Sequence, residues 1–190
     1  MVVDFRKDKQ TPLPLHIDGA AVEVVSSFKY LGVHIAKDLN WSVNTSSLIK
    51  KAHQRLYFLR KLKRAGLGSL VLKSFYRGVV ESIISSYITV WHGNSTVAER
   101  KALHRVVKAA QRTVGSRLPS ITELYTARCR GRALRIIKDS THPAHALFQP
   151  LPSGRRLRSL QCKTTRLKNS FYPEAIRLLN TSRALLVLSH

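Results

Sequence analysis

After residue 50 the chain carries far more positive than negative charge, and this surplus limits the folds open to it. Residues 51–190 hold 27 of the 33 Lys and Arg and five of the 10 Asp and Glu, a net charge of +22, whereas residues 1–50 hold six and five, a net of +1. Cations in such excess cannot enter an apolar core, so they must lie on surfaces that face water or a polyanion. The natural partner of the basic section is nucleic acid, with an anionic membrane surface as the weaker alternative.

The nearly neutral amino-terminal section has the pattern of short strands. Val2–Phe5 is rich in residues that favour strands. Leu13–Ile17 and Ala21–Val25 flank Asp18-Gly19, a pair that tolerates positive φ and predicts a tight hairpin. The β-branched and aromatic residues of Phe28–Ile35 predict a further strand.

From about Trp41 the apolar residues recur at helical spacing. A core-facing stripe with three- and four-residue steps consists of Leu48, Ala52, Leu56, Leu59 and Leu62. Gly66-Leu67-Gly68 ends this helix. The next helix, from about Ser69 to Trp91, is apolar nearly all round, which is typical of the middle of a bundle. Within it, the stretch from Leu70 to Trp91 is interrupted too often for a membrane span, by four serines and by the charged residues Lys73, Arg77 and Glu81.

Two capping boxes predict where the next helices begin. Thr96 with Glu99 opens a third helix, and Ser120 with Glu123 opens a fourth, which runs to about Lys138. Prolines then interrupt the chain, and a short helix is expected near Pro173. The predicted class is α+β, mainly α: a small antiparallel β-hairpin or sheet followed by a basic helical bundle. The predicted sections are residues 1–40, which hold the strands, residues 41–140, which form the helical bundle, and residues 141–190, which are basic and partly irregular.

The third helix has two stripes that helical geometry places on opposite faces. The apolar stripe is Leu103, Val106, Val107, Ala110 and Val114, and the cationic stripe is Lys101, Arg105, Lys108 and Arg112. Arg128, Arg132 and Arg135 repeat the cationic ladder on the fourth helix, and Arg60, Lys61, Lys63 and Arg64 form a further cluster. One such helix could be merely a solvated basic face. Two in succession, with few acids nearby, favour phosphate contact, and we expect their cations to gather where a double helix can rest.

The residues that could support catalysis or bind a metal are sparse. His16-Ile17-Asp18 has the H-x-D spacing of an iron site, but Asp18 is better explained by the turn, and His142 with His145 lacks further ligands nearby. Cys129 and Cys162 stand far apart and suit a reducing compartment. None of the ten acids forms a D-D or D-x-D pair, so the sequence shows no carboxylate pair of the kind that two-metal phosphoryl transfer uses, and we expect no such catalysis by this chain alone.

Seven short segments together resemble the end of the reverse transcriptase domain, and the segment after that domain, in animal LINE (non-LTR) retrotransposons. In chain order they are Val2–Arg6, Ser26–Ile35, Trp41-Ser42, Lys50–Ala52, Phe75–Arg77, Ile88–Gly93 and Leu151–Arg156. The resemblance implies that section 1–40 contains the last palm strands and the primer-grip hairpin, and that section 41–140 is a thumb. Tyr30, Leu31 and Gly32 would then set the primer end, with Gly32 allowing close backbone approach.

The resemblance also implies partners and a location. The parent enzyme is an RNA-directed DNA polymerase whose palm aspartates bind Mg²⁺ in a Y/F-x-D-D motif, which is absent from this sequence. We therefore expect no cofactor in this chain. Its expected partners are an RNA–DNA hybrid or duplex and an upstream palm and fingers, without a membrane. An intracellular, nuclear location is expected, since Arg60–Arg64 and Gly154–Arg158 could also act as nuclear addresses.

Two alternatives remain open. The segment that contains Phe28–Ile35 also resembles a module named for the amino-terminal region of AlkB homologue 8, an alkylated-DNA-repair protein. That name suggests a methyltransferase or a 2-oxoglutarate dioxygenase, although the sequence shows no residues for either chemistry. The chain could also be a stand-alone RNA- or DNA-binding protein.

Overall fold

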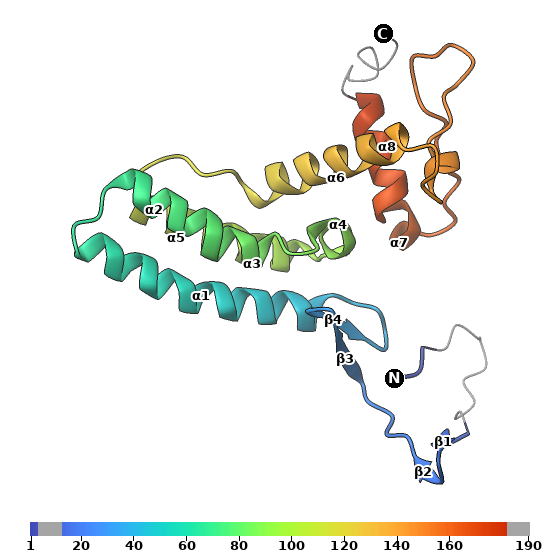
Figure 1. Ribbon diagram of the computed structural model, residues 1–190, viewed down its shortest axis with the longest axis horizontal. Coiled ribbons are helices and arrows are strands. Elements are labelled where there is room, and N and C mark those ends of the chain that lie inside the picture. The colour runs from blue at the N-terminus through green and yellow to red at the C-terminus, as the bar shows by residue number, and fades with distance from the viewer. Residues whose placement is uncertain (4–12, 182–190) are drawn as a thin grey trace.

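The computed structural model describes residues 1–3 and 13–181, and α-helices dominate them (Figure 1). The two hairpins pair β1 (His16–Ile17) with β2 (Ala20–Ala21) and β3 (Ser27–Tyr30) with β4 (Val33–Ala36). The helices are α1 (Ser42–Arg64), α2 (Ser69–Phe75), a π-helical segment (Tyr76–Glu81), α3 (Ser82–Ile84), α4 (Ile88–Trp91), a 3₁₀ turn (His92–Asn94), α5 (Val97–Val114), α6 (Ile121–Lys138), a second 3₁₀ turn (His145–Leu147), α7 (Thr165–Lys168) and α8 (Phe171–Thr181). The predicted fold class, α+β and mainly α, is confirmed.

The first hairpin forms where the Asp-Gly pair predicts it. Asp18 and Gly19 have φ of 49° and 78°, and the antiparallel partners are His16 with Ala21 and Ile17 with Ala20. Positive φ at both turn residues matches the twist of the flanking strands. The hairpin is shorter than the sequence predicts. Of the predicted strand at Val2–Phe5, Val2 and Val3 form no strand, and residues 4 and 5 lie outside the described residues.

A second hairpin replaces the single strand predicted over Phe28–Ile35. Leu31 and Gly32 take φ of 46° and 88°, so the chain reverses there and Tyr30 pairs with Val33. The prediction of one continuous strand is therefore wrong, and the hairpin implied by the family resemblance is present. A Cβ on Gly32 would meet no atom within 4 Å. Within the described residues Gly32 thus serves the turn, and its close approach to a primer stays a prediction.

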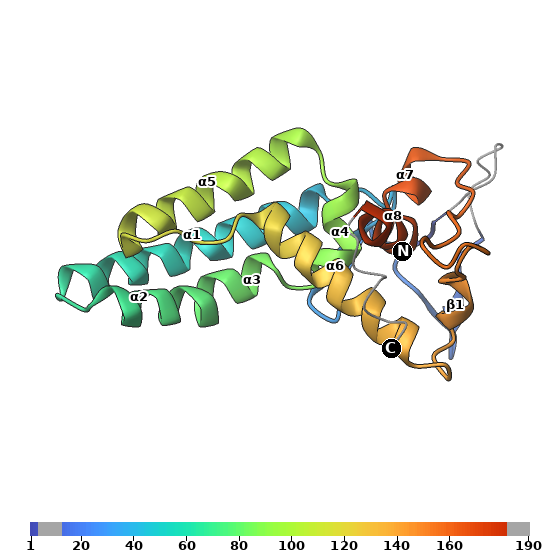
Figure 2. The same ribbon diagram turned by 90° about the horizontal axis from the view of Figure 1, so that it is seen from above.

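Three helical rods pack side by side as the body of the molecule. α1 and α5 run in the same direction (Figures 1 and 2). The rod from α2 to α3 runs in the opposite direction, from the end of α1 toward the start of α5 (Figure 1). The predicted apolar stripe of α1 is buried from Leu48 to Leu59, and Leu62 is partly buried. The apolar stripe of α5 is buried throughout, from Leu103 to Val114. Burial of these two stripes stabilises the bundle.

The segment from Ser69 to Trp91 is not one continuous helix. It changes to π-helical geometry at Tyr76–Glu81 and breaks before α4, where Tyr87 has φ of 50°. One side is exposed, with Leu70 80% accessible, so the segment lies at the edge of the bundle and not in its middle. A hydrophobic run cannot reveal either feature, because both are backbone adjustments to the packing around it. No described helix is long and apolar enough to cross a membrane.

The carboxy-terminal helices pack across the bundle's end. After α5 the chain returns along the bundle, and α6 then crosses α8 (Figure 2). The predicted short helix near Pro173 is α8. Between these helices, Pro150 and Leu157 pair as an isolated antiparallel bridge. The Asn180 side chain holds this turn, because its Nδ2 donates to the Leu157 oxygen at 3.0 Å and its Oδ1 accepts from the Leu157 amide at 2.8 Å.

Candidate nucleic-acid interface

The capping boxes fix where α5 and α6 begin, as predicted. The Thr96 hydroxyl accepts from the Glu99 amide at 3.2 Å, and the Glu99 carboxylate accepts from the Thr96 amide at 2.7 Å. Ser120 and Glu123 make the same pair of bonds at α6. These bonds satisfy free amides of the first turn and set the phase of each helix.

The two stripes of α5 lie on opposite faces. Its apolar stripe is buried, and the four cations of the other stripe are all exposed: Lys101, Arg105, Lys108 and Arg112. The described residues contain two ion pairs, Arg117 with Glu123 and Arg177 with Glu174. Within those residues, therefore, no carboxylate neutralises the α5 stripe. A face with four cations and no paired acid is suited to a polyanion.

A second cationic cluster occupies the carboxy-terminal end of α1. Arg60, Lys61, Lys63 and Arg64 are exposed there. Because α1 and α5 run in the same direction, this cluster and Arg112 lie at the same end of the bundle (Figures 1 and 2). Cations in the last turn also stabilise the helix by interacting with its free carbonyl groups, so part of their role is structural.

The cations of α6 have different environments. Arg128 and Arg135 are exposed, but Arg132 is partly buried. A guanidinium nitrogen of Arg132 donates to the Thr89 hydroxyl at 3.2 Å, and its central carbon lies 4.4 Å from the ring centroid of Phe171. Arg132 thus links α6 to α4 and α8. Helical spacing alone could not separate it from its two exposed neighbours.

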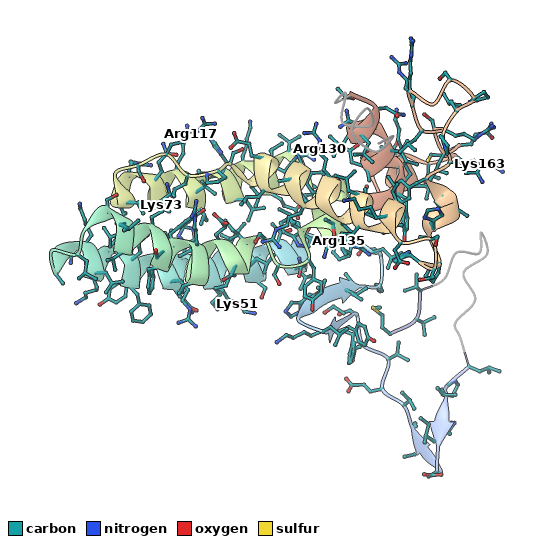
Figure 3. The ribbon with its side chains drawn as sticks, turned by 45° about the horizontal axis from the view of Figure 1, so that its top comes forward. Lys51, Lys73, Arg117, Arg130, Arg135 and Lys163 are labelled. Atoms are coloured by element: carbon teal, nitrogen blue, oxygen red, sulfur yellow. The ribbon has the colours of Figure 1, made fainter. Side chains whose placement is uncertain are left out.

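The surplus cations are not confined to one face of the molecule. Figure 3 shows Lys51 and Arg117 at opposite edges of the helical body in that view. The sequence predicts that the cations gather where a double helix can rest. The four cations of α5 share one exposed face, but the charge as a whole is spread around the bundle and does not gather on one surface. The binding role of each residue stays a prediction.

The residues expected to set the primer end lie at the tip of the second hairpin. Tyr30 and Leu31 are exposed, and Gly32 completes the turn. The hairpin is tied to the start of α1, where the Asn44 side chain accepts from the His34 amide at 3.2 Å. The α1 cluster lies at the other end of that helix. A helix of 23 residues is about 35 Å long, so the hairpin and the cluster are far apart.

The residue patterns did not predict the contacts that His92 and Gly93 make with the carboxy-terminal part of the chain. His92 is buried, its ring centroid lies 4.4 Å from that of Tyr125, and neither ring nitrogen has a hydrogen-bond partner. Burial, aided by Arg100, lowers the pKa of the imidazole to about 4. At Gly93 the Asn169 carbonyl oxygen would lie 2.1 Å from an added Cβ. His92 and Gly93 therefore lie where the bundle meets the carboxy-terminal part of the chain.

The described residues offer no metal centre, since no three of their His, Cys, Asp and Glu side chains come together. His16 and Asp18 lie at an exposed turn. The His142 Nδ1 accepts from the Ala144 amide at 3.0 Å, and the His145 Nδ1 lies 3.1 Å from the Ile136 oxygen. Both of these histidines therefore support the loop. Cys129 and Cys162 are free thiols.

The geometry defines a helical protein with an exposed cationic helix face, and comparisons with known proteins agree with both expected resemblances. The chain is 29% identical over 111 residues to the retrovirus-related Pol polyprotein from type-1 retrotransposable element R1 4 of Nasonia vitripennis. This match covers 56% of the chain and 28% of the polyprotein, so the chain is related to part of a retrotransposon Pol polyprotein.

Residues 41–82 match the family described as alkylated DNA repair protein alkB homolog 8, N-terminal. The matched residues form α1, α2, the π-helical segment and the first residue of α3. They begin after Phe28–Ile35, so the resemblance lies further along the chain than the sequence suggested. No solved structure matches the chain significantly.

Proposed function

We propose that this chain is the thumb-side part of a non-LTR retrotransposon reverse transcriptase and that it holds template–primer nucleic acid through phosphate contacts. One observation carries the proposal: the α5 stripe places four exposed cations, without paired acids in the described residues, opposite a fully buried apolar stripe. The relation to a retrotransposon Pol polyprotein supports it. Phosphate neutralisation dominates affinity in such complexes and does not depend on base sequence.

The shape of the bundle suits a duplex laid along it. α1 and α5 lie side by side, with the α1 cluster and Arg112 at one end and the second hairpin at the other. A span of about 35 Å is close to one turn of a double helix. In this proposal Tyr30, Leu31 and Gly32 meet the primer end, and the exposed cations of α1, α5 and α6 meet backbone phosphates.

Polymerisation is assigned to the palm of the parent enzyme and not to this chain. Two-metal phosphoryl transfer requires carboxylates that converge on Mg²⁺. No two of the ten acids stand as a D-D or D-x-D pair, and the described residues contain no group of three acidic, His or Cys side chains. The described residues therefore do not fit a magnesium site. The expected partner for catalysis is an upstream palm and fingers, in the nucleus.

The match to the AlkB homologue 8 family supports a second candidate, a nucleic-acid-binding module that works apart from a polymerase. The matched residues 41–82 do not include the H-x-D triplet at His16. Iron and 2-oxoglutarate binding that disappears in His16→Ala would favour an oxygenase over both binding functions.

The proposal is tested by measuring the affinity of the full chain for a labelled RNA–DNA hybrid. The test variant replaces Lys101, Arg105, Lys108 and Arg112 by Ala. The control replaces two exposed lysines and two exposed arginines outside α5 by Ala: Lys37, Lys163, Arg155 and Arg158. Both variants lose two Lys and two Arg, so they differ in position and not in charge or residue type. We expect the test variant to lose at least about tenfold more affinity than the control. Equal losses would contradict a specific role for the α5 face.

A further inference from the structure

A shallow groove separates α1 from the helical rod that comes after it in the chain. Its cavity has a volume of about 330 Å³. The apolar residues that line it are Phe58, Leu62, Phe75 and Val79, and the charged ones are Arg55 and Lys61. Val79 belongs to the π-helical segment. Such segments occur frequently at functional sites, so the local backbone change is a second feature that singles out this groove.

Two aromatic rings at this groove remain accessible. Phe58 is 47% and Tyr57 is 53% exposed, and their centroids lie 5.5 Å apart at an interplanar angle of 78°. The Lys61 Nζ lies 5.5 Å from the Tyr57 centroid. Folding alone gives no reason to expose two large adjacent rings, since burying them would stabilise the protein. An exposed aromatic pair beside a cavity indicates a binding surface.

The charge of the groove selects an anionic ligand. Arg55 and Lys61 stand three residues before and three residues after Phe58, so they flank its ring along one face of α1. The lining contains no acidic side chain. An acidic amphipathic helix of a partner protein would satisfy the same charges. The accessible aromatic pair favours a ligand that presents flat rings between negative charges.

We infer that this groove binds single-stranded nucleic acid, with an unpaired base stacked on Phe58 and the adjoining phosphates beside Arg55 and Lys61. Stacking on aromatic side chains within a cationic groove is how proteins hold single strands without reading their sequence. The groove shares Lys61 with the α1 cluster but uses none of the α5 cations. It extends the proposed duplex contact to unpaired nucleic acid, and the α5 and Phe58 variants test the two contacts separately.

The test compares two labelled 12-nucleotide ligands with equal numbers of phosphates, oligo-dA and an abasic strand. The wild-type chain is expected to bind oligo-dA about tenfold or more tightly than the abasic strand, because only the former can stack. Phe58→Ala should abolish this preference and Phe58→Trp should retain it. The matched control is Tyr87→Asn, which removes a half-exposed ring outside the groove and suits the positive φ at that position.

Each outcome decides the inference. Equal binding of both ligands by the wild type, or a preference that persists in Phe58→Ala, overturns it. Binding of a designed acidic amphipathic peptide that depends on Phe58, without any base preference, overturns it in favour of a protein partner. Affinity for the RNA–DNA hybrid, measured on the same proteins, should not change in Phe58→Ala. A loss of hybrid affinity in the α5 variant alone bears on the duplex contact, and the base preference of the wild-type chain and of Phe58→Ala decides the inference about the groove.

Discussion

The guanidinium of Arg132 lies 4.4 Å from the ring centroid of Phe171, and this contact fastens α6 to α8. Together with the hydrogen bond from Arg132 to Thr89, it distinguishes Arg132 from the exposed Arg135 one turn later. Arg132→Ala should therefore lower the free energy of unfolding by about 2 kcal/mol, because a cation–π contact and a hydrogen bond are both lost. Arg135→Ala should change it by less than about 0.5 kcal/mol. Urea denaturation of both variants checks this, and equal effects would contradict a structural role for Arg132.

Gly93 should be intolerant of any side chain. An added Cβ would meet the Asn169 carbonyl oxygen at 2.1 Å and the Tyr125 hydroxyl at 3.0 Å. Gly93→Ala must therefore push two backbone segments apart, at a cost of about 2–3 kcal/mol. The control is Gly131→Ala within α6, where a Cβ meets nothing within 4 Å and helix propensity gains up to about 1 kcal/mol. Thermal unfolding should move in opposite directions for the two variants.

The buried His92 should make stability depend on pH. Its folded pKa is about 4 and its ordinary value is 6.5, so between these values the unfolded chain binds a proton that the folded chain does not. The free energy of unfolding should therefore fall as the pH drops from 6.5 toward 4, by up to about 3 kcal/mol, and His92 should have no effect above that window.

His92→Phe isolates this effect, because the imidazole nitrogens have no hydrogen-bond partner for the phenyl ring to lose. Burial raises the pKa of the Glu81 carboxyl and would act in the opposite direction, but it is present in both proteins. Denaturant unfolding at pH 7.0, 5.5 and 4.5 should show a weaker loss in acid for the variant than for the wild type. The same pH dependence in both would contradict the prediction.

The two thiols should differ in reactivity. Cys129 is fully buried, and burial raises the pKa of its thiol to about 11, whereas Cys162 is partly exposed. Since the thiolate is the nucleophile, native protein should react rapidly at one cysteine only, and unfolded protein at both. Mass spectrometry after brief iodoacetamide treatment identifies the site. In Cys162→Ser the native protein should remain unlabelled; rapid labelling of that variant would show that α6 opens readily.

The sequence predicts the parts of this fold that depend on local chemistry. The capping boxes at Thr96 and Ser120 set the starts of α5 and α6, and the Asp18-Gly19 pair sets the first turn. The alternation of buried and exposed residues along α5 results from helical periodicity alone. The exposed cations of the candidate site were found by this same reasoning.

The features that the sequence could not predict depend on packing between distant segments. The π-helical segment and the break at Tyr87 interrupt an apolar run whose periodicity is too weak to locate them. The role of Arg132 requires Phe171, which lies 39 residues away, and that of Gly93 requires the backbone at Asn169. The hairpin turn at Leu31-Gly32 came from the family resemblance, because Leu at positive φ is uncommon and the strand pattern hides it.

The salt dependence of binding tests the central claim, phosphate contact by the cationic face of α5, most directly. Affinity of the wild-type chain for an RNA–DNA hybrid should be measured from about 50 to 200 mM monovalent salt. Each phosphate neutralised by a cation contributes a slope of about −0.9 in the logarithm of affinity against the logarithm of salt. Four contacts predict a slope of about −3 or steeper. Removing the four α5 cations should make the slope shallower by about 3. An affinity that does not change with salt would contradict the account.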